Sequence, residues 1–205
     1  MAIVIEEAVH NAAVYYQKMI RIVEPKSSDA GIISEIGRYA FRHAFEHLFF
    51  NREELQQYLD YTYDIAKLSA SLQKENNTYF LAMLNEQPVG FAKVKRYSLN
   101  QQIDSFAQTE LQKIYVLPGY HGSGAAHVLL QEVIKLAREV QADQLWLDTH
   151  ISNARAIRFY EKHGFKKHDK YFFTIGTQQF EYDLMTLLIK SKVKNQNSKV
   201  QQHLI

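Results

Sequence analysis

Apolar residues recur in two different periods along this chain of 205 residues, and together they predict helices alternating with strands. Residues 19–25, MIRIVEP, form a β-branched run that ends at Pro25, which predicts a first strand. Asp29 opens a helical pattern that continues to Phe45, and Asn51 caps a second one. Apolar side chains share one side of the first predicted helix: Ile32, Ile33, Ile36, Tyr39, Ala40 and Phe45.

Strand patterns dominate the remainder of the chain. TYFLAML and PVGFAKVKRY flank the turn at 85–87 and predict a hairpin, and 110–117 predicts a third β run. Further elements follow in order: a helix over 122–140, the strand QLWLDT, a helix over 152–164 closed by Gly164, and strands near 165–174 and 179–189. We expect one domain over 19–190, an N-terminal extension over 1–18 and a polar C-terminal tail over 191–205.

Composition narrows the classes of protein this chain can belong to. Hydrophobic residues make up 46% and charged residues 22%, with no apolar run long enough to cross a bilayer. The formal charge of +2 is too small to predict a nucleic-acid surface. Because cysteine is absent, disulfides, thiolate metal sites and cysteine nucleophiles are excluded. We therefore expect a soluble, cytoplasmic protein with a small-molecule partner and neither a membrane nor a nucleic acid.

The stretch LQKIYVLPGYHGSGAAHVLL places three glycines within six positions, between a predicted strand and a predicted helix. Gly122 and Gly124 lack side chains where the helix begins, so backbone amides can approach an anion such as phosphate. A Walker P-loop is excluded because Ala125 and Ala126 stand where lysine and a hydroxyl are required. A dinucleotide fingerprint fits poorly, since its third glycine is His127, and a purely structural turn remains an alternative.

Two motifs in this region resemble the GNAT superfamily of N-acetyltransferases. The family's [QR]xxGx[GA] loop aligns with 121–126, where His121 replaces the usual Gln or Arg. The segment NARAIRFYEKHGF resembles the family's NxxAxxFYxxxGF pattern, and the resemblance covers roughly 20–189. It implies an α/β (α+β) fold of GNAT type, in which a mixed, mostly antiparallel central sheet is flanked by helices and splays between its two central strands.

The resemblance also implies acetyl-CoA as co-substrate and a role for individual residues. Tyr160 would be the acid that protonates the leaving thiolate, and Glu110 the base that takes the amine's proton, usually through water. The amide of Val116 or Leu117, at the strand's bulge, would stabilise the oxyanion. The coenzyme would be bound by Ile114, Tyr115, Val116, His121, Gly122, Ser123, Gly124, Ala125, Ala126 and Asn153.

For the acceptor, the resemblance implies a site between the first two helices and the last hairpin. Phe41, Phe45 and His150 are the first candidates, and further candidates are Glu46, Tyr58, Tyr61 and Tyr171. Parts of FRHAFEHLFF and FFTIGTQQFEYDLM look similar to bacterial spermidine/spermine acetyltransferases, which implies a small primary amine and a polyamine first. Dimers are frequent in the family, so a homodimer is one expected state.

Two alternatives belong to other functional classes. His43, Glu46 and His47 spell HxxEH, the inverted zinc-peptidase motif, whose spacing places two imidazoles one helical turn apart. A zinc-dependent hydrolase is therefore an alternative, against our prediction of no metal. A coenzyme-A-binding module without catalysis is the other, suggested by His121 and opposed by Tyr160.

Overall fold

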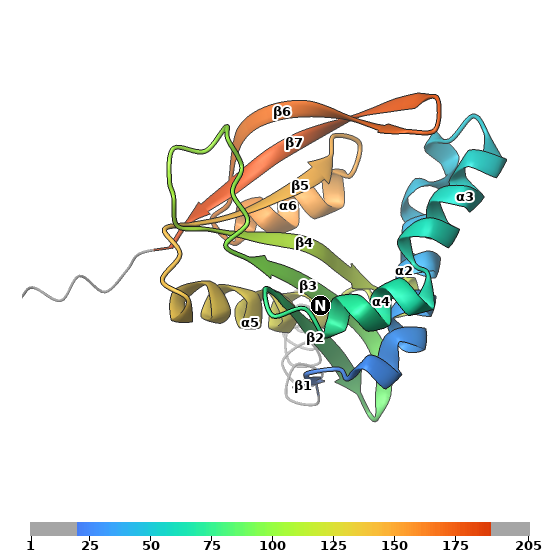
Figure 1. The fold of residues 1–205 in the computed structure, drawn as a ribbon, viewed down its shortest axis with the longest axis horizontal. Coiled ribbons are helices and arrows are strands. Elements are labelled where there is room, and N and C mark those ends of the chain that lie inside the picture. Colours follow the sequence, from blue (N-terminus) through green and yellow to red (C-terminus); the bar gives the residue numbers. More distant parts are fainter. Residues whose placement is uncertain (1–19, 190–205) are drawn as a thin grey trace, which may run out of the picture.

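The computed structural model describes residues 20–189, and the predicted extension over 1–18 and tail over 191–205 lie outside the described residues. Seven strands form one sheet in the order β1-β2-β3-β4-β5-β7-β6 (Figure 1). The strands are β1 (Ile20–Val23), β2 (Asn77–Leu84), β3 (Gln87–Arg96), β4 (Gln108–Val116), β5 (Gln144–His150), β6 (Lys166–Ile175) and β7 (Gln178–Leu188).

All neighbouring strands in the described sheet are antiparallel except β4 and β5, which are parallel. Their pairing extends only over Gln108–Glu110 and Gln144–Trp146. Beyond these residues the two strands diverge toward the end of the molecule where α2 and α3 lie (Figure 1). The predicted fold class, including the splay between central strands, is confirmed.

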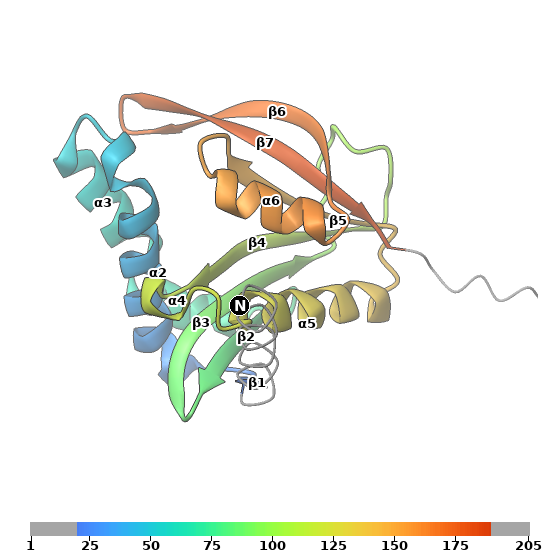
Figure 2. The same ribbon diagram turned by 180° about the vertical axis from the view of Figure 1, so that it is seen from behind.

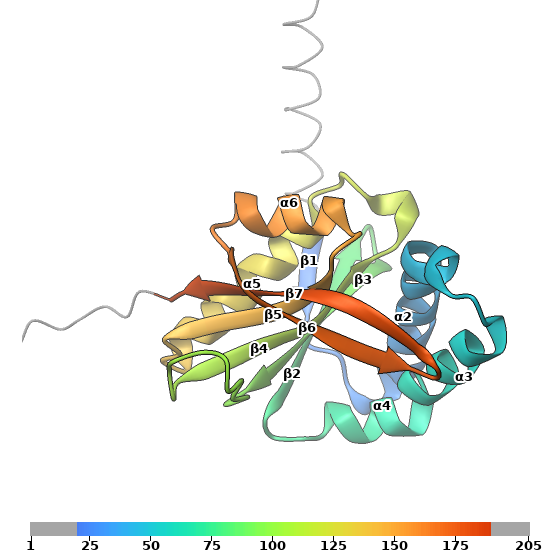
Figure 3. The same cartoon turned by 90° about the horizontal axis from the view of Figure 1, so that it is seen from above.

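Helices cover both faces of the sheet. α5 and α6 lie on one face (Figure 2), and α4 lies on the opposite side (Figure 3). The helices are α2 (Ala30–Phe45), α3 (Arg52–Thr62), α4 (Ile65–Leu72), α5 (Ala125–Glu139) and α6 (Ala154–Lys162). None of the helices within 20–189 is long and apolar enough to cross a membrane.

Most predicted elements are found, with two differences. The sequence predicts two helices before the hairpin, whereas the structure has a third, α4, whose N-cap Asp64 accepts a 2.8 Å hydrogen bond from the amide of Lys67. At eight residues it is too short to show a clear apolar period. The helix predicted from residue 122 begins at Ala125, because Gly122 and Gly124 have φ of 86° and 91° and belong to the preceding turn.

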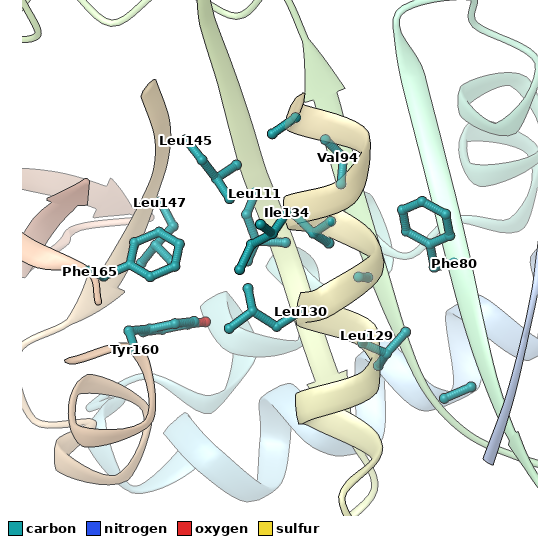
Figure 4. Close-up of a cluster of buried hydrophobic side chains, with 14 of the residues drawn as sticks. Phe80, Val94, Leu111, Leu129, Leu130, Ile134, Leu145, Leu147, Tyr160 and Phe165 are labelled. Atoms are coloured by element: carbon teal, nitrogen blue, oxygen red, sulfur yellow. The ribbon is translucent and has the colours of Figure 1, made fainter. Parts of the chain in front are cut away.

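The two faces of the sheet bury separate hydrophobic cores. On the α5 and α6 side, Leu129, Leu130 and Ile134 of α5 pack against the strands and against Tyr160 and Phe165 (Figure 4). On the other side, α2 and α3 pack onto a core rich in aromatic residues. Gly90 allows β3 and β4 to come close, because a Cβ there would lie 2.5 Å from the Tyr115 carbonyl oxygen.

Candidate active site

The glycine-rich turn between β4 and α5 presents backbone amides at the start of a helix. Ser123 donates its amide to the Tyr120 carbonyl at 3.2 Å, and Ala125 donates to the Ser123 hydroxyl at 3.3 Å. The helical ladder begins with Val128, which donates to the Gly124 carbonyl at 3.0 Å. The intervening amides of the first turn therefore have no intrahelical acceptor and are available to an anion, which the helix dipole would also attract.

His121 stands at this turn as a neutral imidazole, with Arg155 beside it. Burial lowers the pKa of His121, and the positive charge of Arg155 lowers it further. A guanidinium can only donate, so Nδ1 of His121 accepts from Arg155 at 2.6 Å, and its Nε2 donates to the Val116 carbonyl at 3.0 Å. The positive charge that the family's Gln or Arg position can carry is supplied here by Arg155, from α6.

A bulge in β4 determines which groups face the splay. Lys93 pairs with Lys113 and Val94 with Leu111, so Gln112 has no partner in β3. Leu117 donates its amide to the Val89 carbonyl at 2.8 Å, which places Val116 at a non-hydrogen-bonded position opposite Gly90. By alternation, Ile114 and Val116 direct their backbone groups away from β3, toward the gap beside β5.

This hydrogen bond corrects one expectation about the oxyanion donor. The amide of Leu117 is already engaged, so of the two predicted donors only that of Val116 faces the splay. The bulge lies at Gln112 and not at these two residues. Strand alternation turns the amide of Val116 away from β3. Because β5 has diverged from β4 at this point, no strand pairs with this amide.

A cavity of about 1490 Å³ extends from the glycine turn, between β4 and β5, to α2 and α4. It brings together the predicted residues Glu110, Ile114, Tyr115, Val116, His121, Gly122, Gly124, Ala125, Ala126, Asn153, Tyr160, Phe41, Phe45 and His150. Ser123 is the exception, since its hydroxyl accepts from Ala125 and the residue lies outside the lining. Of the further acceptor candidates, Tyr58, Tyr61 and Tyr171 line the cavity and Glu46 does not.

Tyr160 projects from α6 into the space between β5 and α5. Its side chain is only 7% exposed and lines the cavity, and its hydroxyl points toward Leu130 of α5 (Figure 4). Burial raises the pKa of Tyr160 above its ordinary value of 10.0. The phenol therefore carries its proton at neutral pH and can donate it to a group in the cavity.

Asn153 combines a structural role with a place at the cavity. It is the N-cap of α6, and its side-chain oxygen accepts a hydrogen bond from the amide of Ala156 at 3.2 Å. The side-chain NH₂ group remains as a donor beside the cavity. Ser152, where the predicted helix over 152–164 begins, precedes the cap and hydrogen-bonds Nδ1 of His150 at 2.7 Å.

Two carboxylates lie on the cavity wall. Glu110 is 9% exposed, and one of its oxygens accepts a 2.8 Å hydrogen bond from the Ser98 hydroxyl. Asp148 follows on β5, where burial raises its pKa to about 6, opposed by a hydrogen bond from Tyr171 and reinforced by the charge of Glu110. Both are placed to accept a proton, and Asp148 has a pKa closer to neutrality than an ordinary carboxylic acid.

The three first acceptor candidates form a continuous aromatic wall. The rings of Phe41 and Phe45 have centroids 4.9 Å apart, and Phe45 lies 6.1 Å from His150. His150 in turn meets Tyr182 edge-on at 5.4 Å. Burial lowers the pKa of His150, so this wall is neutral and suited to the aliphatic part of an acceptor.

The HxxEH motif does not form the site that the zinc alternative requires. α2 ends at Phe45, and Glu46–Leu48 form a 3-10 turn, so the three residues do not share one α-helical face. Glu46 lies 3.6 Å from Arg42 and 3.7 Å from Arg52. Within residues 20–189, no three histidine, cysteine or acidic side chains are grouped to hold a metal ion.

Seven charged residues at the cavity were not singled out from the sequence: Lys93, Lys113, Asp148, Arg155, Lys67, Lys74 and Lys162. A charged residue in an otherwise apolar strand was the available signal for the first three. Strand alternation alone would place Lys113 on the wrong face, because it takes no account of the bulge at Gln112.

Comparisons with known proteins agree with this architecture. The model of the acetyltransferase (GNAT) family matches residues 36–165. Uncharacterised N-acetyltransferases of Mycobacterium bovis and Mycobacterium tuberculosis are each 32% identical over 124 residues, which cover 60% of this chain and 75% of the relative.

Solved structures share the fold at low sequence identity. The PaiA N-acetyltransferase of Thermoplasma acidophilum, in complex with coenzyme A, has a TM-score of 0.67 and 20% identity, covering 82% of this chain and 98% of that one. The putative acetyltransferase YncA of Salmonella typhimurium, with acetyl-CoA, has a TM-score of 0.63 and 21% identity, covering 84% and 95%. With the family match over most of the domain, the chain belongs to the GNAT family of acetyltransferases.

Proposed function

We propose that this protein transfers the acetyl group of acetyl-CoA to the primary amine of a small molecule by direct attack. The observation that carries the proposal is the continuity of one cavity from the glycine turn to Tyr160 and on to the two carboxylates. A diphosphate suits the turn, because Gly122 and Gly124 adopt left-handed φ and leave their amides uncovered. The acetyl group then lies within the splay, where Ile114 offers its backbone groups and Val116 its amide, the Val116 carbonyl being bonded to His121.

The chemistry assigns one task to each group. The amine nitrogen attacks the thioester carbonyl carbon, a C–N bond forms, and the C–S bond breaks. Glu110 takes the amine's proton, directly or through water, and Tyr160 gives its own proton to the departing thiolate. The amide of Val116 stabilises the oxyanion. Asn153 and Arg155 hold the coenzyme from α6.

The coenzyme site is tested by a charge placed in the turn. Gly124→Glu adds bulk at a φ of 91° and a negative charge next to the phosphates, so calorimetry should show at least a 100-fold loss of acetyl-CoA affinity, about 2.7 kcal/mol. Gly119→Glu is the matched control, since a Cβ there meets nothing within 4 Å and Gly119 lies outside the cavity lining. Unchanged acetyl-CoA binding by Gly124→Glu would contradict the proposal.

The acceptor is tested by thiol release from acetyl-CoA with a panel of amines. The resemblance to spermidine/spermine acetyltransferases makes spermidine one member of the panel, alongside amino acids and aminoglycosides. Turnover of any amine distinguishes an enzyme from a coenzyme-A-binding module. The proposed function fails if acetyl-CoA binds and no amine in the panel is acetylated.

A further inference from the structure

Three residues form a row across the sheet on the face covered by α4. Tyr79 of β2 is the register partner of Lys93, and Lys93 is the partner of Lys113 on β4. Partners in adjacent antiparallel strands project from the same face. The row therefore brings two ammonium groups together, and Lys113 is the member next to the splay.

The β4 bulge determines that Lys113 faces this side. Glu110 and Lys113 are three residues apart, a spacing that would place them on opposite faces of a regular strand. Because Gln112 has no partner in β3, both side chains lie on the same face, as their partners Lys95 and Lys93 do. Because of the bulge, the Lys113 ammonium faces the part of the cavity proposed to bind the acceptor.

The charge of Glu110 acts on both ammonium groups, but neither forms a close ion pair with it. Among residues 20–189, neither Lys93 nor Lys113 lies within 4.0 Å of a carboxylate oxygen or donates a side-chain hydrogen bond. Their nitrogens lie 5.6 Å from the Tyr79 ring and 5.5 Å from the Tyr63 ring, near the outer limit of a cation–π contact. Like charges on directly opposed residues destabilise a sheet, so this lysine pair is unfavourable for the stability of the fold.

The charge on this face is divided by the splay. Lys93 and Lys113 lie on the β3–β4 side, and Lys67 of α4 and Lys74, which follows the end of that helix, line the same cavity. Across the gap, Asp148 lies on β5, two residues beyond the last paired residue Trp146 and on the same face. A molecule that spans the gap therefore meets the lysines and Glu110 on one side and Asp148 on the other.

We infer that the acceptor is an amine that also carries an anionic group, with its amine at Glu110 and Asp148 and its anion at Lys93 and Lys113. This inference rests on the proposed function and names its substrate class. The anion is a carboxylate or a phosphate-type group, since both accept hydrogen bonds from two ammonium groups. A polyamine would bring a second cation against the lysine pair, which opposes its binding.

The test compares amines of matched length that differ only in the far group. Calorimetry on the full chain, saturated with coenzyme A, should be run with 5-aminopentanoate, pentylamine, 1,5-diaminopentane and 4-aminobutylphosphonate. We expect one of the anionic amines to bind about 10- to 100-fold more tightly than pentylamine, the usual effect of charge-assisted hydrogen bonds. The stronger of the two anionic amines identifies the anion as carboxylate or phosphonate.

Variants assign the effect to the lysine pair. Lys93→Met with Lys113→Met keeps the aliphatic stems and removes both charges, so the preference for the anionic amine should disappear while affinity for pentylamine stays the same. Lys113→Arg should retain the preference. Lys95→Met is the matched control, because Lys95 lies on the same strand and face but outside the cavity lining.

Three results would overturn the inference: the diamine or pentylamine binds as tightly as the anionic amines, no anionic amine binds, or the preference survives in the double variant. Acetyl-CoA binding and thiol release are measured separately on the same samples. A protein that binds acetyl-CoA and acetylates the diamine best would keep the proposed function and lose this inference. If the protein binds the anionic amine through the two lysines but does not bind acetyl-CoA, the anion site is supported and the proposed function is contradicted.

Discussion

Tyr160 can serve as an acid because of where its hydroxyl lies. The side chain is held between α5 and α6 in the hydrophobic core, so its ring is fixed by packing and its proton is retained by burial. Two other residues have pKa values that are likewise shifted by their surroundings. His121 is neutral because of burial and Arg155, and Asp148 gains a pKa of about 6 from burial.

Tyr160→Phe removes the acid and leaves the packing. We expect turnover of an accepted amine to fall about 10²- to 10⁴-fold, the usual contribution of a general acid, with acetyl-CoA affinity unchanged. Thiol release under saturating substrates measures the change. Tyr39→Phe on α2 is the control, since Tyr39 is 60% exposed and outside the cavity lining. Full activity in Tyr160→Phe would remove this residue from the mechanism.

At the scale of elements, β4 and α6 do most of the positioning. In β4, one unpaired residue places Glu110, Lys113 and Tyr115 on the acceptor face and leaves Ile114 and Val116 on the coenzyme side. α6 begins at its cap Asn153 and brings Arg155 to the glycine turn and Tyr160 to the core. In the proposed mechanism, the same helix therefore holds one substrate at its start and supplies a proton from its last turn.

Arg155→Gln tests whether α6 compensates for His121 at the glycine turn. Because Arg155 is exposed, we expect a modest loss, about 3- to 10-fold in acetyl-CoA affinity, that shrinks as the salt concentration rises. Calorimetry at two ionic strengths measures both effects. Arg158→Gln, an exposed change on the same helix outside the cavity lining, should leave affinity unchanged. Equal affinities for Arg155→Gln and wild type would assign the phosphate contacts to backbone amides alone.

At the scale of the whole molecule, the site lies where separate layers meet. In the proposed arrangement, the α5 face supplies the coenzyme side, the α2–α4 face supplies the acceptor side, and the splay joins them through the sheet. The β6–β7 hairpin is attached to α3, since Glu54 accepts hydrogen bonds from the amide and hydroxyl of Thr177 at 3.0 and 2.9 Å. Because the cavity is lined by elements from both faces of the sheet, a buried charge in it affects the stability of the whole fold.

Global stability should depend on pH through the lysine pair. Burial, and after it the charge of Lys93, lowers the pKa of Lys113 from 10.5 to about 8 against the opposing effect of the Glu110 charge. Between these values the unfolded chain binds more protons than the folded one, so this group's destabilising effect is full below pH 8 and fades as pH rises to 10.5. We expect Lys113→Met to be more stable than wild type at pH 7 by about 1 kcal/mol, allowing for partial hydration of the ammonium.

Urea unfolding followed by circular dichroism at several pH values checks this expectation. The advantage of Lys113→Met should narrow as the pH rises through 8 toward 10.5. An advantage that does not change with pH would mean that the extra stability comes from the methionine's packing and not from the lost charge.

Local patterns in the sequence predicted most of the helices and strands, and the resemblance to the GNAT superfamily predicted the fold class. The strands, the hairpin at 85–87, the cap at Asn51 and the fold class are confirmed. Gly122, Gly124 and Asn153 lie within short motifs whose geometry depends on neighbouring residues, so their place at the cavity follows from a few consecutive positions. The short α4 was missed, because eight residues do not show a reliable helical period.

Only the tertiary structure decided the charges on the acceptor side. Lys93 and Lys113 are 20 positions apart, and they meet because of strand register and one bulge that no local pattern specifies. His121 and Arg155 come together only when α6 packs beside the turn, and Asp148 faces the cavity because β5 diverges from β4. Backbone preferences are set by near neighbours, whereas side-chain environments are set by whichever distant segments the fold brings into contact.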